Sequence, residues 1–315
     1  NYFQGRTGDL LEIDLELIAD QTAFLMDSND LFAQFLVYEK SATGTNTQTV
    51  IQTRNNRGDI ELTRTDGSAV GTIIFSDRTG EGLFENSGKF YFAPSMDPEQ
   101  KDSNQNRAGF QGLLYVTVET DSGIQEFYID VVDGLSTMGQ PAVTLIEAVD
   151  DGKVVEIARL QQRLNYLGFP PELTVVSVDN HELNDLKEFL VVDGLLGPKT
   201  KSATQLFNAA VTDRIPDGNL VLDQTTTDWL NFSGAPAWQE LTDKDANGEI
   251  IVSNDFDIST QFERYGTNWA VDAILNSETN QVMQITAVSS VDGWHSSEFH
   301  TEHQSGTDID IDLPG

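Results

Sequence analysis

Short apolar runs, either alternating with polar residues or clustered, dominate the first half of the chain. Each run is rich in β-branched and aromatic residues, and clusters of Gly, Asn, Asp and Ser separate the runs. They are TVIQTR (49–54), AVGTIIF (69–75), GKFYFAP (88–94), GLLYVTVET (112–120) and IQEFYIDVV (124–132). This pattern is typical of short strands joined by turns, so we predict an antiparallel β-sandwich over residues 6–146.

Near residue 150 the spacing of the apolar residues changes to the spacing of a helix. In VVEIARLQQRLNYLGFP the apolar positions are Val154, Ile157, Leu160, Leu164 and Leu167, spaced by three and four. Gly168 should end this helix, because a glycine at the C′ position adopts the left-handed conformation without a steric penalty. A turn, VDGLLGP, should then deliver a second helix with Thr200 near its start and an apolar stripe of Ala203, Leu206 and Phe207. We predict a small all-α module over residues 147–232.

Residues 233–315 contain both strand-like alternation and helical spacing, so we predict that they form an α+β unit. YGTNWAVDAILN (265–276) should be a helix that buries Trp269, Val271, Ile274 and Leu275, and QVMQITAVSS (281–290) should be a strand. TDIDIDL (307–313) alternates strictly, so Asp308, Asp310 and Asp312 share one face of a strand.

Charge and composition restrict the partners. The 315 residues contain 51 Asp and Glu against 18 Lys and Arg, for a net charge of −33, which would repel nucleic acid and anionic lipid. No apolar run is long enough to predict a membrane span. Without cysteine, any metal must be held by His, Asp or Glu. The acidity suits either a salty environment or calcium loops, and the composition leaves the oligomeric state open.

The first five residues, NYFQG (1–5), resemble the remnant of a protease-cleavable expression tag. We therefore exclude them from the expected fold. Because the native N-terminus is then replaced, the lack of a signal peptide does not argue against secretion.

Two stretches of the β-rich part, GKFYFAP and NRAGFQGLLYVTVETDSG, loosely resemble the late strands of cadherin-like and bacterial Ig-like repeats of large extracellular adhesins. The resemblance implies a spacer that is stiffened by Ca²⁺ or presents a face to a ligand. The alternative is a plain β-sandwich with acidic loops.

LQQRLNYLGF followed by VDGLLGPKTKSATQLF closely resembles the peptidoglycan-binding domain of bacterial cell-wall hydrolases. In that family LQ, LG and an aromatic are followed by DG, GP, a Thr and a Phe. The chain departs from the family in a longer link, PELTVVSVDNHELNDLKEFL, and in Asn208, where Gln is common. The resemblance implies peptidoglycan as a partner; the alternative is a module that serves only as a packing spacer.

LTDKDANGEIIVS contains the order D-x-D-x-N-G, which brings oxygen ligands together around Ca²⁺ while glycine permits the sharp turn. The candidate calcium ligands are Asp243, Asp245, Asn247 and Glu249. The twelfth position is Asn254 instead of the bidentate Glu of an EF-hand. The alternative is an acidic turn without a metal.

FHTEHQSGTDIDIDLPG (299–315) combines two histidines with a ladder of aspartates, and zinc accepts both types of ligand. The stretch closely resembles the zinc motif of penicillin-insensitive murein endopeptidases and, more widely, of D-Ala-D-Ala metallopeptidases. That resemblance implies His303 and Asp310 as zinc ligands, a loop folded back at Gly306, and His300 as an active-site histidine.

The family's third zinc ligand lies in a later H-x-H motif, and no histidine follows His303 here, although His295 could substitute. We therefore expect a truncated form, an incomplete sequence or a degenerate enzyme. The leading hypothesis is an extracellular or cell-envelope zinc endopeptidase that cleaves stem or cross-link peptides of peptidoglycan. The alternative is a non-catalytic wall-anchoring or adhesin fragment with a calcium-stabilised β-domain.

Overall fold

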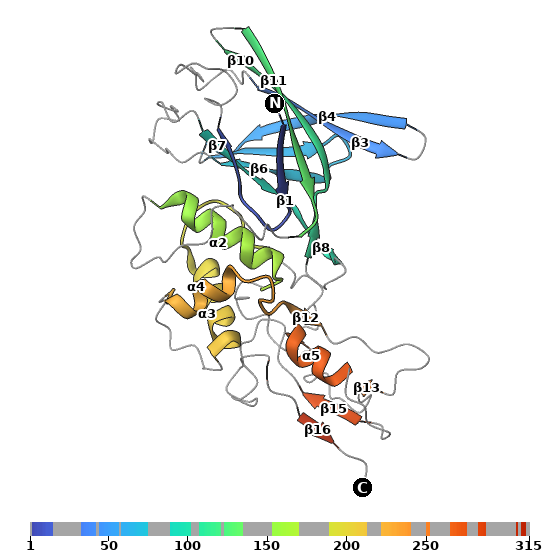
Figure 1. The fold of residues 1–315 in the computed structure, drawn as a ribbon, viewed down its shortest axis with the longest axis vertical. Helices are drawn as coiled ribbons and strands as arrows, with labels where there is room; N and C mark the ends of the chain where they lie inside the picture. The colour runs from blue at the N-terminus through green and yellow to red at the C-terminus, as the bar shows by residue number, and fades with distance from the viewer. Residues whose placement is uncertain are drawn as a thin grey trace.

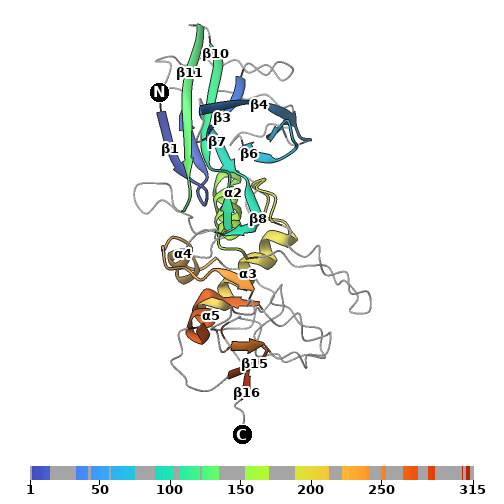
Figure 2. The ribbon, with the colours of Figure 1, turned by 90° about the vertical axis from the view of Figure 1, so that its right-hand side faces the viewer.

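A computed structural model describes parts of all three regions that the sequence distinguishes. The described residues are 2–14, 33–41, 44–56, 58–74, 89–101, 107–120, 123–134, 153–169, 189–212, 222–240, 250–252, 265–275, 283–287, 307 and 310–312. The β-sheets occupy one end of an elongated molecule, helices lie in the middle, and the last strands are at the far end (Figure 1). The view from the side in Figure 2 shows the same order along the long axis.

Eleven strands are described in the first 132 residues. They are β1 (Tyr2–Arg6), β2 (Leu11–Asp14), β3 (Ala33–Ser41), β4 (Gly44–Arg54), β5 (Ile60–Arg64), β6 (Ala69–Ile74), β7 (Lys89–Pro94), β8 (Met96–Lys101), β9 (Arg107–Gly109), β10 (Gly112–Thr120) and β11 (Gly123–Val132). The five runs predicted from their apolar pattern coincide with β4, β6, β7, β10 and β11, so these predictions are confirmed.

Nine of these strands hydrogen-bond in the order β1-β11-β10-β3-β4-β5-β6-β7-β2. All neighbours are antiparallel except β1 and β11, which run parallel. β4 belongs to two sheets, because its first half pairs with β3 and its second half, from Val50, pairs with β5. The prediction of antiparallel β-sheets followed by a few helices is confirmed.

Like β4, the N-terminal segment connects the two sheets. β1 pairs with β11, and after four intervening residues β2 pairs with β7. We excluded residues 1–5 from the fold, and that exclusion is wrong for residues 2–5, since they form β1 together with Arg6. The ring of Phe3 packs edge-on against Phe127, with centroids 5.7 Å apart. The resemblance of this segment to a tag remnant stays a prediction about its origin.

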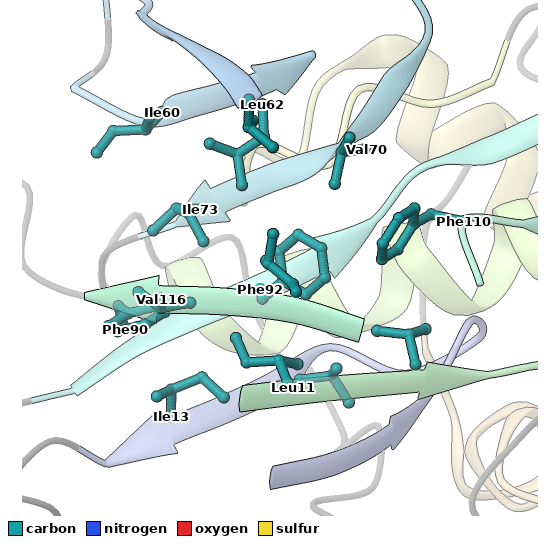
Figure 3. Close-up of a cluster of buried hydrophobic side chains, with 14 of the residues drawn as sticks. Leu11, Ile13, Ile60, Leu62, Val70, Ile73, Phe90, Phe92, Phe110 and Val116 are labelled. Atoms are coloured by element: carbon teal, nitrogen blue, oxygen red, sulfur yellow. The ribbon is translucent and has the colours of Figure 1, made fainter. Parts of the chain in front are cut away.

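One apolar cluster contains residues from both sheets, and Figure 3 shows side chains from β2, β5, β6, β7 and β10 converging on it. Its largest members include Phe92 and Phe127, which are fully buried. Phe92 also meets Phe110 edge-on at 6.3 Å between ring centroids. Because the alternating positions of facing strands fill this space, burial of apolar surface holds the two sheets together.

The helical part contains α2 (Val154–Tyr166), α3 (Pro198–Thr212) and α4 (Gln224–Leu230). The predicted end of α2 is confirmed: Gly168 has φ of 76°. Its N–H donates to the carbonyl of Asn165, and the N–H of Phe169 donates to that of Leu164, both at 3.0 Å. These two bonds form a Schellman motif, in which glycine avoids the strain that a side chain would meet.

Apart from Val154, the predicted apolar stripes of both helices are buried in a second cluster. Ala203, Leu206 and Phe207 are at most 2% exposed, as the spacing predicted. Phe169 lies between Phe207 and Trp238, with ring centroids 5.0 and 5.7 Å away. Trp238 follows the predicted end of the module, at residue 232, so this core draws on residues beyond that position.

Helix α2 is buried on two sides. Val154, Val155 and Ala158 pack in a third cluster with Leu10, Ile74, Tyr91 and Ala93 of the β-part. Farther along the helix, Gln162 Nε2 donates to the carbonyls of Thr7 and Pro94, at 2.6 and 2.9 Å. The β-part is therefore attached to the helices through a buried, hydrogen-bonded contact.

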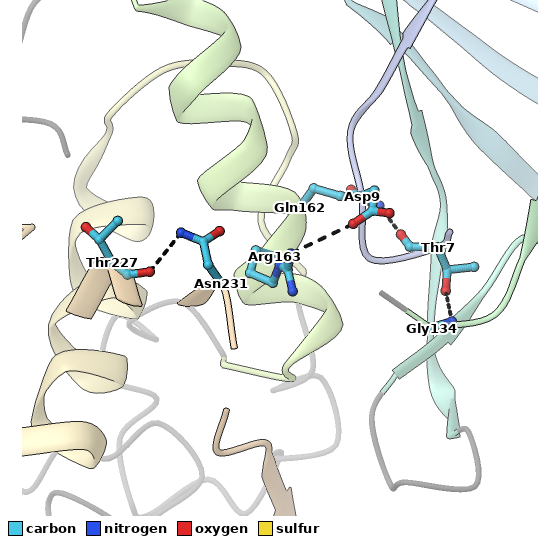
Figure 4. A network of polar contacts seen from close by, with 7 residues as sticks. All are labelled: Thr7, Asp9, Gly134, Gln162, Arg163, Thr227 and Asn231. Carbon is cyan, nitrogen blue, oxygen red and sulfur yellow. Dashed lines mark hydrogen bonds and ion pairs between the residues drawn. The ribbon is translucent and has the colours of Figure 1, made fainter. Parts of the chain in front are cut away.

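A buried ion pair completes this contact (Figure 4). Arg163 lies 3.8 Å from Asp9, and their side chains are 9% and 7% exposed. Burial lowers the pKa of Arg163, and the negative charge of Asp9 acts in the opposite direction. The pair therefore places two opposite charges together where both side chains are largely buried.

The C-terminal part contains β12 (Trp238–Glu240), β13 (Ile250–Val252), β14 (Tyr265–Thr267), α5 (Asn268–Leu275), β15 (Met283–Ala287) and β16 (Asp310–Asp312). The helix predicted over 265–276 is confirmed for Asn268–Leu275, but Tyr265–Thr267 form strand β14 instead, because they pair with β12. The two predicted strands are confirmed in β15 and β16. Of the four residues expected on the buried side of α5, Trp269 is half-buried. The side chains of the other three, Val271, Ile274 and Leu275, are not among those that the structure describes. Among the described residues, no helix combines the length and apolar character that crossing a membrane requires.

Candidate functional site

The structure describes the predicted zinc motif only in part. His300, His303 and Gly306 lie outside the described residues, as does His295. The backbone of Asp310 is described, and it begins strand β16. The candidate calcium ligands Asp243, Asp245, Asn247 and Glu249 also lie outside the described residues. Within the described ranges, no group of three or more His, Asp or Glu side chains could hold a metal ion.

Strand β16 lies on one side of a three-stranded sheet. β15 pairs in parallel with β13 and antiparallel with β16, and Asp310 stands opposite Ala287. The register shifts between Ile285 and Ala287, so β15 carries an irregularity beside Asp310. Asp310 and Asp312 occupy alternate positions of the strand, as the sequence pattern predicts.

A buried amide organises the turn that separates α2 from α3. Gln161 Oε1 accepts from the backbone N–H groups of Asp193 and Gly194, at 3.0 and 2.8 Å. Its Nε2 donates to Asp193 Oδ1 at 2.8 Å and to Thr200 Oγ1 at 3.0 Å. Gln161 and Thr200 are 1% and 3% exposed, so these bonds form out of contact with water.

Gly194 fits this turn for two reasons. Its φ is 66°, and an added Cβ would lie 2.5 Å from Cγ1 and from the carbonyl oxygen of Val154. A residue with a side chain would therefore be strained and would also collide with the first turn of α2. The Q, DG and T positions of the sequence motif are the positions that meet in this network.

The same turn presents apolar side chains to solvent. Val191 is 68% exposed and Leu195 is 40% exposed. Asn165 fixes the start of the segment, because its amide donates to the carbonyl of Leu190 and accepts from the N–H of that residue, each at 2.8 Å. A rigid turn with exposed apolar groups is suited to contact a ligand, since little order is lost on binding.

Sequence reasoning missed an aromatic cluster at the end of α4. Trp229 meets Phe232 at 5.5 Å and Trp269 at 5.0 Å between ring centroids. Phe232 is 53% exposed, and the two tryptophans are half-buried. The predicted helix contained Trp269, but nothing in the local pattern indicated that a ring about 40 residues earlier would meet it.

Searches of family models, of curated proteins and of solved structures found no match to this chain. The functional argument therefore depends on the sequence motifs and on the contacts described above.

Proposed function

We propose that this protein binds peptidoglycan through its helical module and hydrolyses peptide bonds of the stem or cross-link with a zinc site in its C-terminal part. It would act outside the cytoplasm, at the cell envelope or beyond it, where that polymer is found. The β-part would be a β-sandwich spacer.

The observation that carries the proposal is the hydrogen-bond network around Gln161. The motif by which the chain resembles wall-binding modules requires Gln, Asp-Gly and Thr at separated positions. In the structure these residues bond to one another and shape a single turn. This network gives a physical reason for the spacing of four motif residues, so it supports the resemblance more strongly than the letters alone.

For the zinc site, His303 and Asp310 are the proposed ligands, His295 is the candidate third ligand within this sequence, and His300 would lie near the metal. Imidazole nitrogen and carboxylate oxygen fit the ligand preferences of zinc. Bound zinc would supply a water of lowered pKa and polarise the scissile carbonyl. The placement of Asp310 on a strand beside β15 is compatible with a fixed ligand. The loop of Asp243, Asp245, Asn247 and Glu249 would bind Ca²⁺.

Hydrolysis is tested by incubating the protein with purified peptidoglycan and measuring newly released amino groups, with and without added Zn²⁺. We expect release that requires zinc and that His303→Ala abolishes. Glu302→Gln, at an adjacent position that the motif does not use, is the matched control. Zinc content of the same sample, measured by elemental analysis, should be about one ion per chain.

A second candidate is a non-catalytic wall-anchoring protein. It is favoured by the motif itself, which supplies one histidine and one aspartate where a catalytic zinc site uses three protein ligands. Binding to peptidoglycan without release of amino groups at saturating zinc would support this candidate over the hydrolase.

A further inference from the structure

The aromatic cluster of Trp229, Phe232 and Trp269 is held from several directions. Trp229 packs against the core of the helical part, so the cluster is anchored on its inner side. The edge of one tryptophan meets the face of the other at an interplanar angle of 63°, an orientation that aromatic quadrupoles favour. Trp269 belongs to α5, so the cluster joins the helical part to the C-terminal part.

Phe232 projects from this anchored base in a defined position. Its N–H donates to the carbonyl of Trp229 at 3.0 Å, and its carbonyl accepts from the N–H of Ala235 at 3.1 Å. The ring lies over Gly234, where an added Cβ would be 2.7 Å from Cε1 of the phenylalanine. An exposed ring that is fixed by its backbone and by a neighbouring ring loses little conformational entropy when a ligand stacks on it.

Several residues beside the ring in the sequence are polar. Asn231 and Ser233, on either side of Phe232, are exposed, as is Asp228, which precedes Trp229. Asp272 is also exposed and lies one helical turn from Trp269. The stretches 222–240 and 265–275 contain no Lys or Arg. Amide, hydroxyl and carboxylate groups next to an exposed ring can accept hydrogen bonds from hydroxyl groups while the ring contacts apolar C–H faces.

We propose that this aromatic cluster binds the neutral glycan strand of the wall polymer, with a sugar ring stacked on Phe232. The inference rests on the proposed function, and it assigns the contact to the amino-sugar chain instead of the peptide stem. Two observations favour this occupant. The chain has a net charge of −33, so an anionic polymer segment would be repelled, whereas an N-acetylated sugar carries no charge. In addition, Phe232 is the exposed ring of the three, and one aromatic side chain offers about 150–250 Å², well below the roughly 800 Å² per partner of a stable protein interface.

The test uses the complete chain and a soluble N-acetylglucosamine hexasaccharide. Two of the four tryptophans are in the cluster, so stacking should change the tryptophan emission during a titration. Phe232→Ala should raise the dissociation constant about tenfold, as expected when an anchoring aromatic side chain is removed. Ile124→Ala is the matched control, because Ile124 is 69% exposed on β11 and lies in the β-part. Its affinity should equal that of the wild type.

A second variant, Trp269→Phe, keeps an aromatic ring and should weaken binding less than Phe232→Ala. Equal affinity of the wild type and of Phe232→Ala for the hexasaccharide would overturn the inference. So would a change in oligomeric state caused by Phe232→Ala, since the patch would then contact a second copy of the chain. Binding to purified peptidoglycan without binding to the hexasaccharide would refute the glycan assignment and leave the proposed function intact. Failure to bind either would contradict both.

Discussion

Replacing Gln161 by Leu tests the network that supports the wall-binding proposal. Leucine has a similar volume, so the substitution removes hydrogen bonds without opening a large cavity. The N–H groups of Asp193 and Gly194 would lose the side-chain oxygen that accepts from both of them. Asp193 Oδ1 would keep its bond from the N–H of Leu195, which is 2.9 Å long. The main consequence is therefore two backbone donors without their acceptor in a buried turn.

The expected loss of stability follows from those two unpaired donors. Each buried donor that is left without a partner costs about 1–3 kcal/mol, and partial entry of water into a turn near the surface reduces the sum. We expect Gln161→Leu to lower the free energy of unfolding by about 2–4 kcal/mol. The turn carries the exposed Val191 and Leu195, so affinity for peptidoglycan should fall as well.

Denaturant unfolding followed by tryptophan emission measures the stability, and hydrogen exchange measures the turn directly. The amide protons of Asp193 and Gly194 should exchange faster in the variant. Gln224→Leu is the matched control, because Gln224 is exposed and its side chain bonds to Asp228 within one helix. It should change stability by no more than about 0.5 kcal/mol. Equal stability and equal exchange in Gln161→Leu and the control would refute the argument.

Two further substitutions test other parts of the fold. Gly194→Ala should lower the free energy of unfolding by about 2 kcal/mol or more beyond the effect of Gly67→Ala, which is roughly the penalty for overpacking. Both glycines have positive φ, but an added Cβ collides with Val154 only at position 194 and meets nothing within 4 Å at position 67. Thermal unfolding measures the difference, and equal costs would show that the turn moves freely away from α2. Asp9→Ala should lower the free energy of unfolding by about 3 kcal/mol, because it removes the carboxylate that pairs with the buried charge of Arg163. A loss below about 1 kcal/mol would mean that water reaches this pair.

Local patterns predicted the elements well where one face of an element is buried. The spacing of Ile157, Leu160 and Leu164 predicted α2, and all three are buried in the helical core. Gly168 predicted the end of the helix because a left-handed residue is needed there. Alternating β-branched and aromatic residues predicted β4, β10 and β11 for the same reason.

Contacts between distant segments could not be predicted in this way. Gln162 and Arg163 have the polar character of a solvent-facing position, yet both are buried, because Thr7, Asp9 and Pro94 supply their partners. These partners are 68 or more residues away in the sequence, so no window around α2 contains them. The crossing of β4 between two sheets is likewise a property of its two neighbours and not of its own pattern.

The candidate site shows the same difference between local motifs and contacts of distant segments. Gln161, Asp193, Gly194 and Thr200 are positions of one sequence motif, and the structure brings them into one network that the sequence analysis did not predict. The meeting of Trp229 and Trp269 went unpredicted, since it depends on how α5 is attached through the pairing of β12 with β14. The zinc and calcium residues other than Asp310 lie outside the described residues, and a strand position alone does not test Asp310 as a ligand, so all of these assignments stay predictions.

The central claim is that this chain recognises peptidoglycan, and co-sedimentation with purified, protein-free sacculi tests it most directly. We expect the protein to pellet with sacculi in a saturable manner. We also expect Gln161→Leu to pellet less than Gln224→Leu at a temperature where both are folded. Protein that remains in the supernatant at all sacculus concentrations would show that the chain does not recognise peptidoglycan.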